Sequence, residues 1–115
     1  MASTPWDYQR YIHGSFGEFS CAKPSYVRLR TAWVSERTLC YLASGKPAVV
    51  EHTGPSRMLP EREGLLRFRD PAEAALCLRL VASDYDRQSR FARQLAEACF
   101  DARTVLPPLL DRVLA

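Results

Sequence analysis

The sequence predicts an α/β fold, specifically a partial Rossmann-like, three-layer domain with a small, mostly parallel sheet and helices at its C-terminal end. Short apolar runs typical of buried strands alternate with segments of helical periodicity. Capping residues precede several of the helical segments. The last third of the chain shows helical patterns alone. Strands separated by helices imply parallel pairing with right-handed crossovers.

Length and composition predict one globular domain over residues 1–115. A chain of 115 residues is long enough to bury its own core. Apolar residues make up 47% and charged residues 25%, a balance typical of globular proteins. The net charge is +3, but the arginines are interleaved with acids, which is more typical of a solvated surface than of a nucleic-acid interface. We therefore expect no nucleic-acid partner.

The same composition bears on the compartment. The longest apolar run falls short of the roughly 18 residues that a membrane span needs, so we expect no such span. Met1 to Arg10 lacks the apolar region of a secretory signal. The four cysteines form no CxxC pair, which argues against a zinc or redox motif. We expect a cytoplasmic protein without a metal.

The N-terminal third contains one helix and one strand with clear signals. Residues 5–13 are predicted to be helical, because Thr4 can cap the helix and a proline occupies its first position. Residues 17–22 are predicted to form a short buried strand. Residues 26–33 alternate in polarity, and this leaves open whether they form a strand or an extended loop.

The clearest helix begins after Ser35 and ends at Gly45. The Ser35 hydroxyl can accept an N–H of the first turn, and Glu36 suits the positive end of the helix dipole. Gly45 stands at the position where glycine commonly ends a helix. Ala48 to Val50 then reads as a strand that is buried on both faces.

The C-terminal part is predicted to contain one more strand and three helices. The strand covers residues 64–68, and the first helix begins after Asp70. The apolar stripe of that helix is predicted to be Ala74, Ala75, Leu78, Val81 and Ala82. A second helix runs from Ser83 or Asp84 to about Phe100. The last helix covers residues 102–114, where two prolines either kink or divide it.

Three predicted strands are fewer than a complete doubly wound sheet contains. Such a small parallel sheet leaves an edge strand without a partner. We therefore expect that upstream sequence or another chain completes the sheet.

A helix ending in Ala43-Ser44-Gly45-Lys46-Pro47 runs directly into the strand Ala48-Val49-Val50. Three features follow in order, namely Thr53-Gly54, Glu63-Gly64-Leu65-Leu66 and a helix opening at Asp70. This ordered set resembles the C-terminal, nucleotide-sugar-binding domain of glycosyltransferases of the GT-B fold. The resemblance extends through Phe100-Asp101-Ala102-Arg103 and covers about residues 15–115.

The resemblance implies a site for a nucleotide-sugar, which would be a substrate rather than a cofactor. A helix N-terminus can stabilise the diphosphate as negative charge develops on it. The resemblance implies no metal at the diphosphate and does not single out a catalytic residue. The candidate contacts lie at the helix start, in the bend after the next strand, and beside the first strand: Ser35, Glu36, Arg37, Thr53, Gly54, Glu18 and Lys23. Trp33 is expected either to stack on the ligand or to pack in the core.

The chain departs from the family pattern at Cys40. Many relatives carry a glutamate there, and it binds the ribose of the nucleotide. A cysteine cannot accept two ribose hydroxyls as a carboxylate does. Either ribose recognition has moved, for example to Glu36, or donor binding is altered.

These observations give two functional hypotheses. The first is the donor-binding segment of a glycosyltransferase that moves a sugar from a nucleotide-sugar to an acceptor. In the resembled enzymes an N-terminal domain supplies the acceptor site, so we expect the 115-residue chain to be inactive alone. The alternative is a non-catalytic α/β interaction module that self-associates through an exposed sheet edge, and Cys40 favours it. A phospho-receiver domain is disfavoured, because no acidic cluster follows the first strand.

Overall fold

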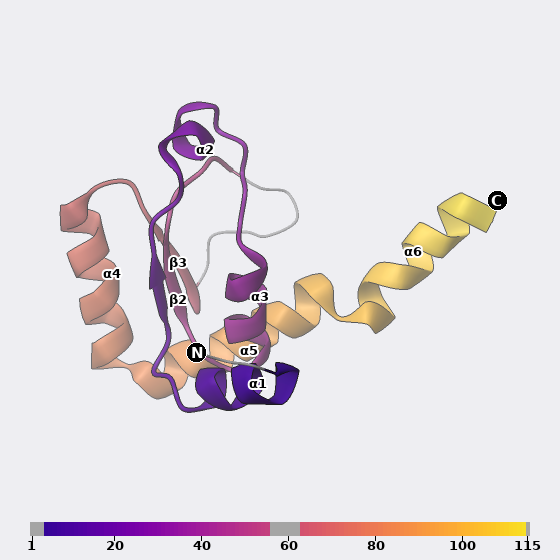
Figure 1. Cartoon of the computed structure of the whole chain (residues 1–115), viewed down its shortest axis with the longest axis horizontal. Coiled ribbons are helices and arrows are strands. Elements are labelled where there is room, and N and C mark those ends of the chain that lie inside the picture. Colours follow the sequence, from indigo (N-terminus) through magenta and orange to yellow (C-terminus); the bar gives the residue numbers. More distant parts are fainter. Residues whose placement is uncertain (1–3, 56–62, 115) are drawn as a thin grey trace.

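A computed structural model describes residues 4–55 and 63–114 of the chain and confirms the α/β fold (Figure 1). In chain order the elements are α1 (Pro5–His13), β1 (Glu18–Ser20), α2 (Pro24–Arg28), α3 (Glu36–Ala43), β2 (Ala48–Glu51), β3 (Leu65–Phe68), α4 (Pro71–Ser83), α5 (Tyr85–Phe100) and α6 (Ala102–Leu114). The described helices include none with the length and apolar character that crossing a bilayer requires.

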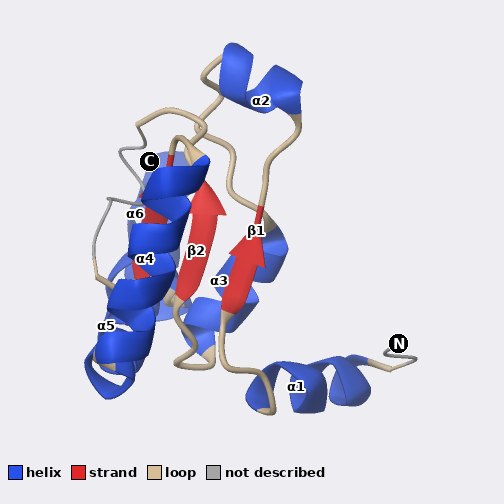
Figure 2. Cartoon of the chain, turned by 90° about the vertical axis from the view of Figure 1, so that its left-hand side faces the viewer, coloured by secondary structure: helices blue, strands red, loops and turns tan. Residues whose placement is uncertain are grey.

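The three strands form one parallel sheet in the order β1-β2-β3. Glu18, Ala48 and Leu65 lie side by side at the start of the three strands. Residues in register share a face of the sheet, so alternate positions along each strand face opposite layers. Figure 2 shows α4 in front of the sheet and α3 behind it. The domain therefore has three layers.

Each face of the sheet carries its own apolar cluster. The cluster on the side of α3 and α5 consists of Leu42, Ala48, Val50, Leu65, Ala92, Leu95 and Ala96. The cluster on the side of α4 consists of Val49, Phe68, Ala74 and Val81. Because both faces of β2 are covered, its residues Ala48, Val49 and Val50 are all buried. The two clusters hold β2 at the centre of the domain.

Side-chain caps begin three of the helices where the sequence predicts them. The side chains of Thr4, Ser35 and Asp70 each accept an N–H from the first turn of α1, α3 and α4 respectively. Each such bond satisfies a backbone donor that the helix itself cannot satisfy, and is typically worth about 1 kcal/mol. The caps therefore fix where these helices start.

The segment 26–33 contains no strand, and the loop alternative holds only for the part that follows α2. It begins within the short helix α2, which buries no residue, and continues as an irregular loop. Pro24 occupies the first turn of α2, where a proline ring presets the backbone for a helix. Arg30 and Ala32 then have positive φ angles of 51° and 60°. The alternation of polar and apolar residues therefore does not mark a strand here, since α2 buries none of its residues.

The buried stripe of α4 differs from the predicted one. Ala74 and Val81 are buried and Cys77 packs against them, whereas Leu78 is 44% exposed. Ala75 is only half-buried and Ala82 is exposed, because the helix turns residues 74, 77 and 81 toward the sheet. Burial raises the pKa of the Cys77 thiol above its ordinary value. The apolar composition of α4 is spread around the helix, so composition alone did not reveal the inward face.

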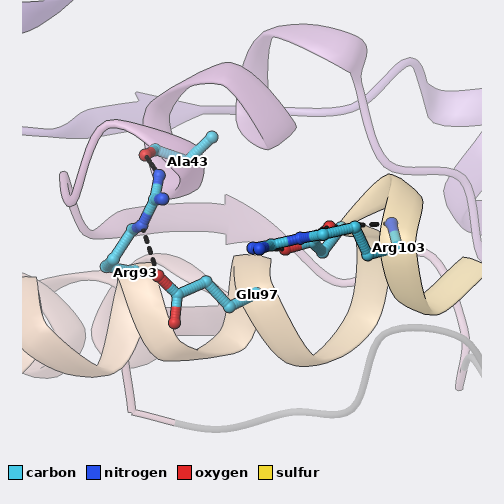
Figure 3. Close-up of polar contacts among 5 residues, drawn as sticks. Ala43, Arg93, Glu97 and Arg103 are labelled. Carbon is cyan, nitrogen blue, oxygen red and sulfur yellow. Dashed lines mark hydrogen bonds and ion pairs between the residues drawn. The ribbon is translucent and has the colours of Figure 1, made fainter.

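Polar contacts link the ends of α3, α5 and α6 (Figure 3). The Arg93 guanidinium on α5 donates to the Ala43 carbonyl oxygen at the end of α3 and to Glu97 Oε1. A carbonyl at a helix C-terminus has no partner within the helix, so Arg93 satisfies it from outside. Arg103, at the start of α6, forms an ion pair with Asp101, in which Nη2 lies 2.8 Å from Oδ2. Pro107 and Pro108 lie inside α6, which buries no residue and is not divided by them.

We predict that Gly64→Ala strongly destabilises the domain. Gly64 precedes β3 with φ of +90°, and an added Cβ would lie 2.4 Å from the Ala92 backbone nitrogen on α5. Backbone cannot move aside cheaply, so we expect a loss of about 3 kcal/mol in the free energy of unfolding. Gly14→Ala is the matched control, because φ at Gly14 is −84° and the nearest atom is 3.5 Å from the added Cβ. Urea unfolding of both variants tests this, and equal midpoints would contradict it.

We also predict a low titration midpoint for Asp101. Hydrogen bonds from Arg103 lower the pKa of this carboxyl from 3.8 to about 2. Because the folded-state pKa is depressed, the interaction contributes above pH 3.8 and is lost as the pH falls through about 2. Carbon-13 NMR of the carboxyl should show this midpoint, which should rise toward 3.8 in Arg103→Met. Arg112→Met should leave it unchanged, and an unmoved midpoint in both variants would refute the assignment.

Candidate functional site

A pocket of about 270 Å³ opens at the carboxyl ends of β1 and β2, beside the first turn of α3. Its walls come from residues 20–23 after β1, residues 33–35 and 37–38 at the front of α3, and residues 50–51 at the end of β2, together with Tyr26 of α2. This edge is where open parallel α/β sheets bind their ligands. The pocket is therefore the candidate functional site.

Ser35 and Arg37 lie at this pocket, as the sequence predicts for the helix start, whereas the exposed Glu36 is not part of its lining. Ser35 Oγ accepts the Arg37 N–H, and the Ser35 carbonyl oxygen accepts the N–H groups of Thr38 and Leu39. Ser35 thus satisfies much of the first turn of α3 by itself. The cationic side chain at this helix start is Arg37, which is 51% exposed.

Glu18 lies between β1 and α3 rather than in the pocket wall. Its side chain is only 4% exposed, and Oε2 accepts a bond of 2.5 Å from Arg37 Nε. The Thr38 hydroxyl donates to Oε1. This placement differs from the expected ligand contact, because a ligand would have to displace one of these two protein donors. The hydrogen bond that Arg37 donates to Glu18 raises the pKa of Arg37, so Arg37 remains a cation.

Lys23 and two aromatic rings form the outer wall of the pocket. Lys23 Nζ lies 5.8 Å from the centre of the Tyr26 ring, and the rings of Tyr26 and Trp33 lie 4.9 Å apart. Trp33 is 45% exposed, so it stands at the pocket and not in the core. Of the two placements open from the sequence, the structure shows the one that permits stacking.

Glu51 is a pocket residue that the sequence reasoning missed. It is the last residue of β2, and its Oε1 accepts the Ala22 N–H at 2.9 Å. The sequence predicts that the strand ends at Val50, one residue too early. A carboxylate directly after a buried apolar run is the signal that could have indicated it. Cys40, by contrast, lines a separate groove between α1 and α3.

The bend at Thr53 and Gly54 is enclosed by the protein itself. Thr53 is 1% exposed, and its hydroxyl donates to the Trp33 carbonyl oxygen and accepts from Arg67 Nη2, both at 2.7 Å. The Gly54 carbonyl oxygen accepts from Arg67 Nη1 at 3.1 Å.

The loop before α3 covers this bend. The Ala32 N–H donates to the Thr53 carbonyl oxygen, and a Cβ added to Gly54 would lie 3.0 Å from the Arg30 carbonyl oxygen. Thr53 and Gly54 therefore do not line the pocket, contrary to the expected cradle shared with the α3 front. A ligand would reach them only if residues 30–33 moved away.

Among residues 4–55 and 63–114, no group of three or more histidine, cysteine or acidic side chains is arranged to hold a metal. The four cysteines are free thiols. Comparisons with protein-family models, curated proteins and solved structures found no match. Function has to be argued from the chemistry of the pocket, because a fold alone does not imply one.

We predict that Thr53→Val lowers the free energy of unfolding by about 1–3 kcal/mol. The variant removes the buried hydroxyl that joins the Trp33 carbonyl to Arg67. Thr104→Val, on an exposed turn of α6, is the control and should change stability by less than about 0.5 kcal/mol. Urea unfolding measures both. A Thr53→Val variant as stable as the control would mean that the hydroxyl does not hold the loop on the bend.

Proposed function

We propose that the chain is the donor-binding segment of a glycosyltransferase and that the pocket at α3 receives a nucleotide-sugar. The observation that carries this proposal is the combination of two cations, Arg37 and Lys23, with the rings of Tyr26 and Trp33 at the carboxyl ends of two parallel strands. Guanidinium and ammonium groups bind phosphate oxygens, and aromatic faces stack on a base or sugar.

Arg37 is the group best suited to the diphosphate. Its Nε is bound by Glu18, and its half-exposed guanidinium carries further N–H donors that can bind phosphate oxygens. Lys23, which also lines the pocket, adds a second positive charge. Two cations in one pocket can stabilise the negative charge that develops on a leaving diphosphate.

Glu51 supplies a carboxylate for the hydroxyls of the ligand. The Ala22 N–H donates to one of its oxygens, and the other can accept a hydrogen bond from a hydroxyl of a ribose or a sugar. Cys40 lines a different groove, so recognition of the ribose does not depend on that position. We propose that Glu51 takes the part that the resembled glycosyltransferases give to their helix glutamate.

The proposal also includes a partner domain and a compartment. In the resembled enzymes a separate domain carries the acceptor site, and we propose that this chain works beside such a domain. We place its function in the cytoplasm, because all four cysteines are free thiols.

Isothermal titration with uridine diphosphate and guanosine diphosphate tests the proposal. The wild-type chain should bind one of them saturably, and Arg37→Ala should weaken that binding on the order of tenfold, because charge-assisted bonds to phosphate are lost. Arg79→Ala is the matched control, since Arg79 is exposed on α4, outside the pocket lining. Binding that is absent, or that is equally strong in Arg37→Ala, would refute the donor-site proposal.

The open edge of β1 favours the alternative, a self-associating interaction module. Within the described residues β1 pairs with β2 alone, and Phe19 on β1 is 52% exposed while its ring stacks on Phe68 at 5.5 Å. An unpaired strand edge beside an exposed aromatic residue can accept another strand. No nucleotide binding together with a concentration-dependent dimer in sedimentation would favour this module over the donor site.

A further inference from the structure

We propose that Glu18 is a positioning residue that orients Arg37 toward the anionic group of the ligand. This inference rests on the proposed function, since it concerns the same pocket. It assigns Glu18 a role that differs from direct contact. Glu18 holds one edge of the Arg37 guanidinium, and the remaining N–H donors of that guanidinium serve the pocket.

The carboxylate is held firmly enough to act in this way. Both of its oxygens accept a hydrogen bond from the first turn of α3, Oε2 from Arg37 and Oε1 from Thr38. The backbone of Glu18 is held as well, because Glu18 pairs with Ala48 where β1 and β2 form the sheet. With its side chain 4% exposed, the carboxylate is shielded from water that could compete for these bonds. It is therefore a rigid acceptor at the back of Arg37.

Arg37 is much more exposed than Glu18, as a positioning role requires. Arg37 belongs to the pocket lining and its side chain remains 51% exposed, although its carboxylate partner is buried. A guanidinium is planar and rigid, and fixing its Nε also fixes the directions of its terminal N–H groups. A side chain held in place before binding loses less conformational entropy when a ligand arrives.

A purely structural role is the competing explanation. In that case Glu18 would only fasten β1 to α3, and its loss would weaken ligand binding through a general loosening of the domain. The two roles differ in one measurable respect. Positioning acts through Arg37, so it vanishes when Arg37 is absent, whereas general loosening persists in that background.

The test is a double-mutant cycle with inorganic pyrophosphate as the probe, measured by calorimetry at neutral pH and low salt. We expect Glu18→Gln to weaken binding on the order of tenfold, and Arg37→Ala to weaken it at least as much. The double variant should bind no more weakly than Arg37→Ala alone. Val81→Ala is the control. Val81 lies on the buried face of α4 and outside the pocket lining, so its loss should lower stability and leave the affinity at the wild-type value.

A second measurement uses only the wild type, so it can be made even if the Glu18→Gln variant does not fold. In proton–nitrogen NMR of the wild type, the Arg37 Nε–H should exchange slowly with water, and its terminal N–H signals should shift when pyrophosphate is added. A rapidly exchanging Nε–H, or Arg37 signals that stay in place while pyrophosphate binds, would overturn the inference.

The outcomes also separate this inference from the function on which it rests. A wild type that binds neither pyrophosphate nor a nucleoside diphosphate overturns both. A wild type that binds, with unchanged affinity in Glu18→Gln or with losses that simply add in the double variant, overturns only the role of Glu18.

Discussion

The architecture of the site depends on one buried carboxylate. Glu18 stands on β1 and is only 7% exposed, and a buried carboxylate costs several kcal/mol unless protein donors satisfy it. Those donors come from the first turn of α3, which must therefore turn Arg37 and Thr38 toward β1. Together with the packing of Leu42 in the core, these bonds constrain how α3 sits on the sheet. Ser35 and Arg37 then come to lie in the lining of the pocket at the carboxyl edge of the sheet, which Lys23 and Glu51 also line.

Most of the elements could be predicted because their signals are local. A capping side chain and the residues it caps are near neighbours in sequence, so the starts of α1, α3 and α4 could be inferred from Thr4, Ser35 and Asp70. The apolar run of β2 likewise carries its own signal of burial on both faces. The short helix α2 gives a weaker signal. It buries no residue, so its apolar residues show no helical periodicity imposed by a core. The predicted sheet is correct in strand number and parallel direction.

The site was harder to predict, because its decisive contacts join residues that are distant in sequence. Nothing near Glu18 shows that its partners lie on α3, so it was expected to meet the ligand. The positive φ angles of Arg30 and Ala32 are equally invisible in the sequence, since residues other than glycine rarely adopt them. They turn the loop onto Thr53 and Gly54, which closes the bend that was expected to be open. The positions of Ser35, Arg37 and Lys23 at the carboxyl edge of the sheet could be predicted, because helix starts and strand ends can be located from local patterns.

Chemical-shift mapping with uridine diphosphate on the nitrogen-15-labelled chain tests the central claim most directly. The account predicts that the amides of Ala22, Lys23 and residues 35–38 shift together along one saturable curve. It also predicts that the enclosed amides of Thr53 and Gly54 change far less. The largest shifts at Thr53 and Gly54, with the α3 front unmoved, would contradict the account. So would the absence of any saturable change around Arg37.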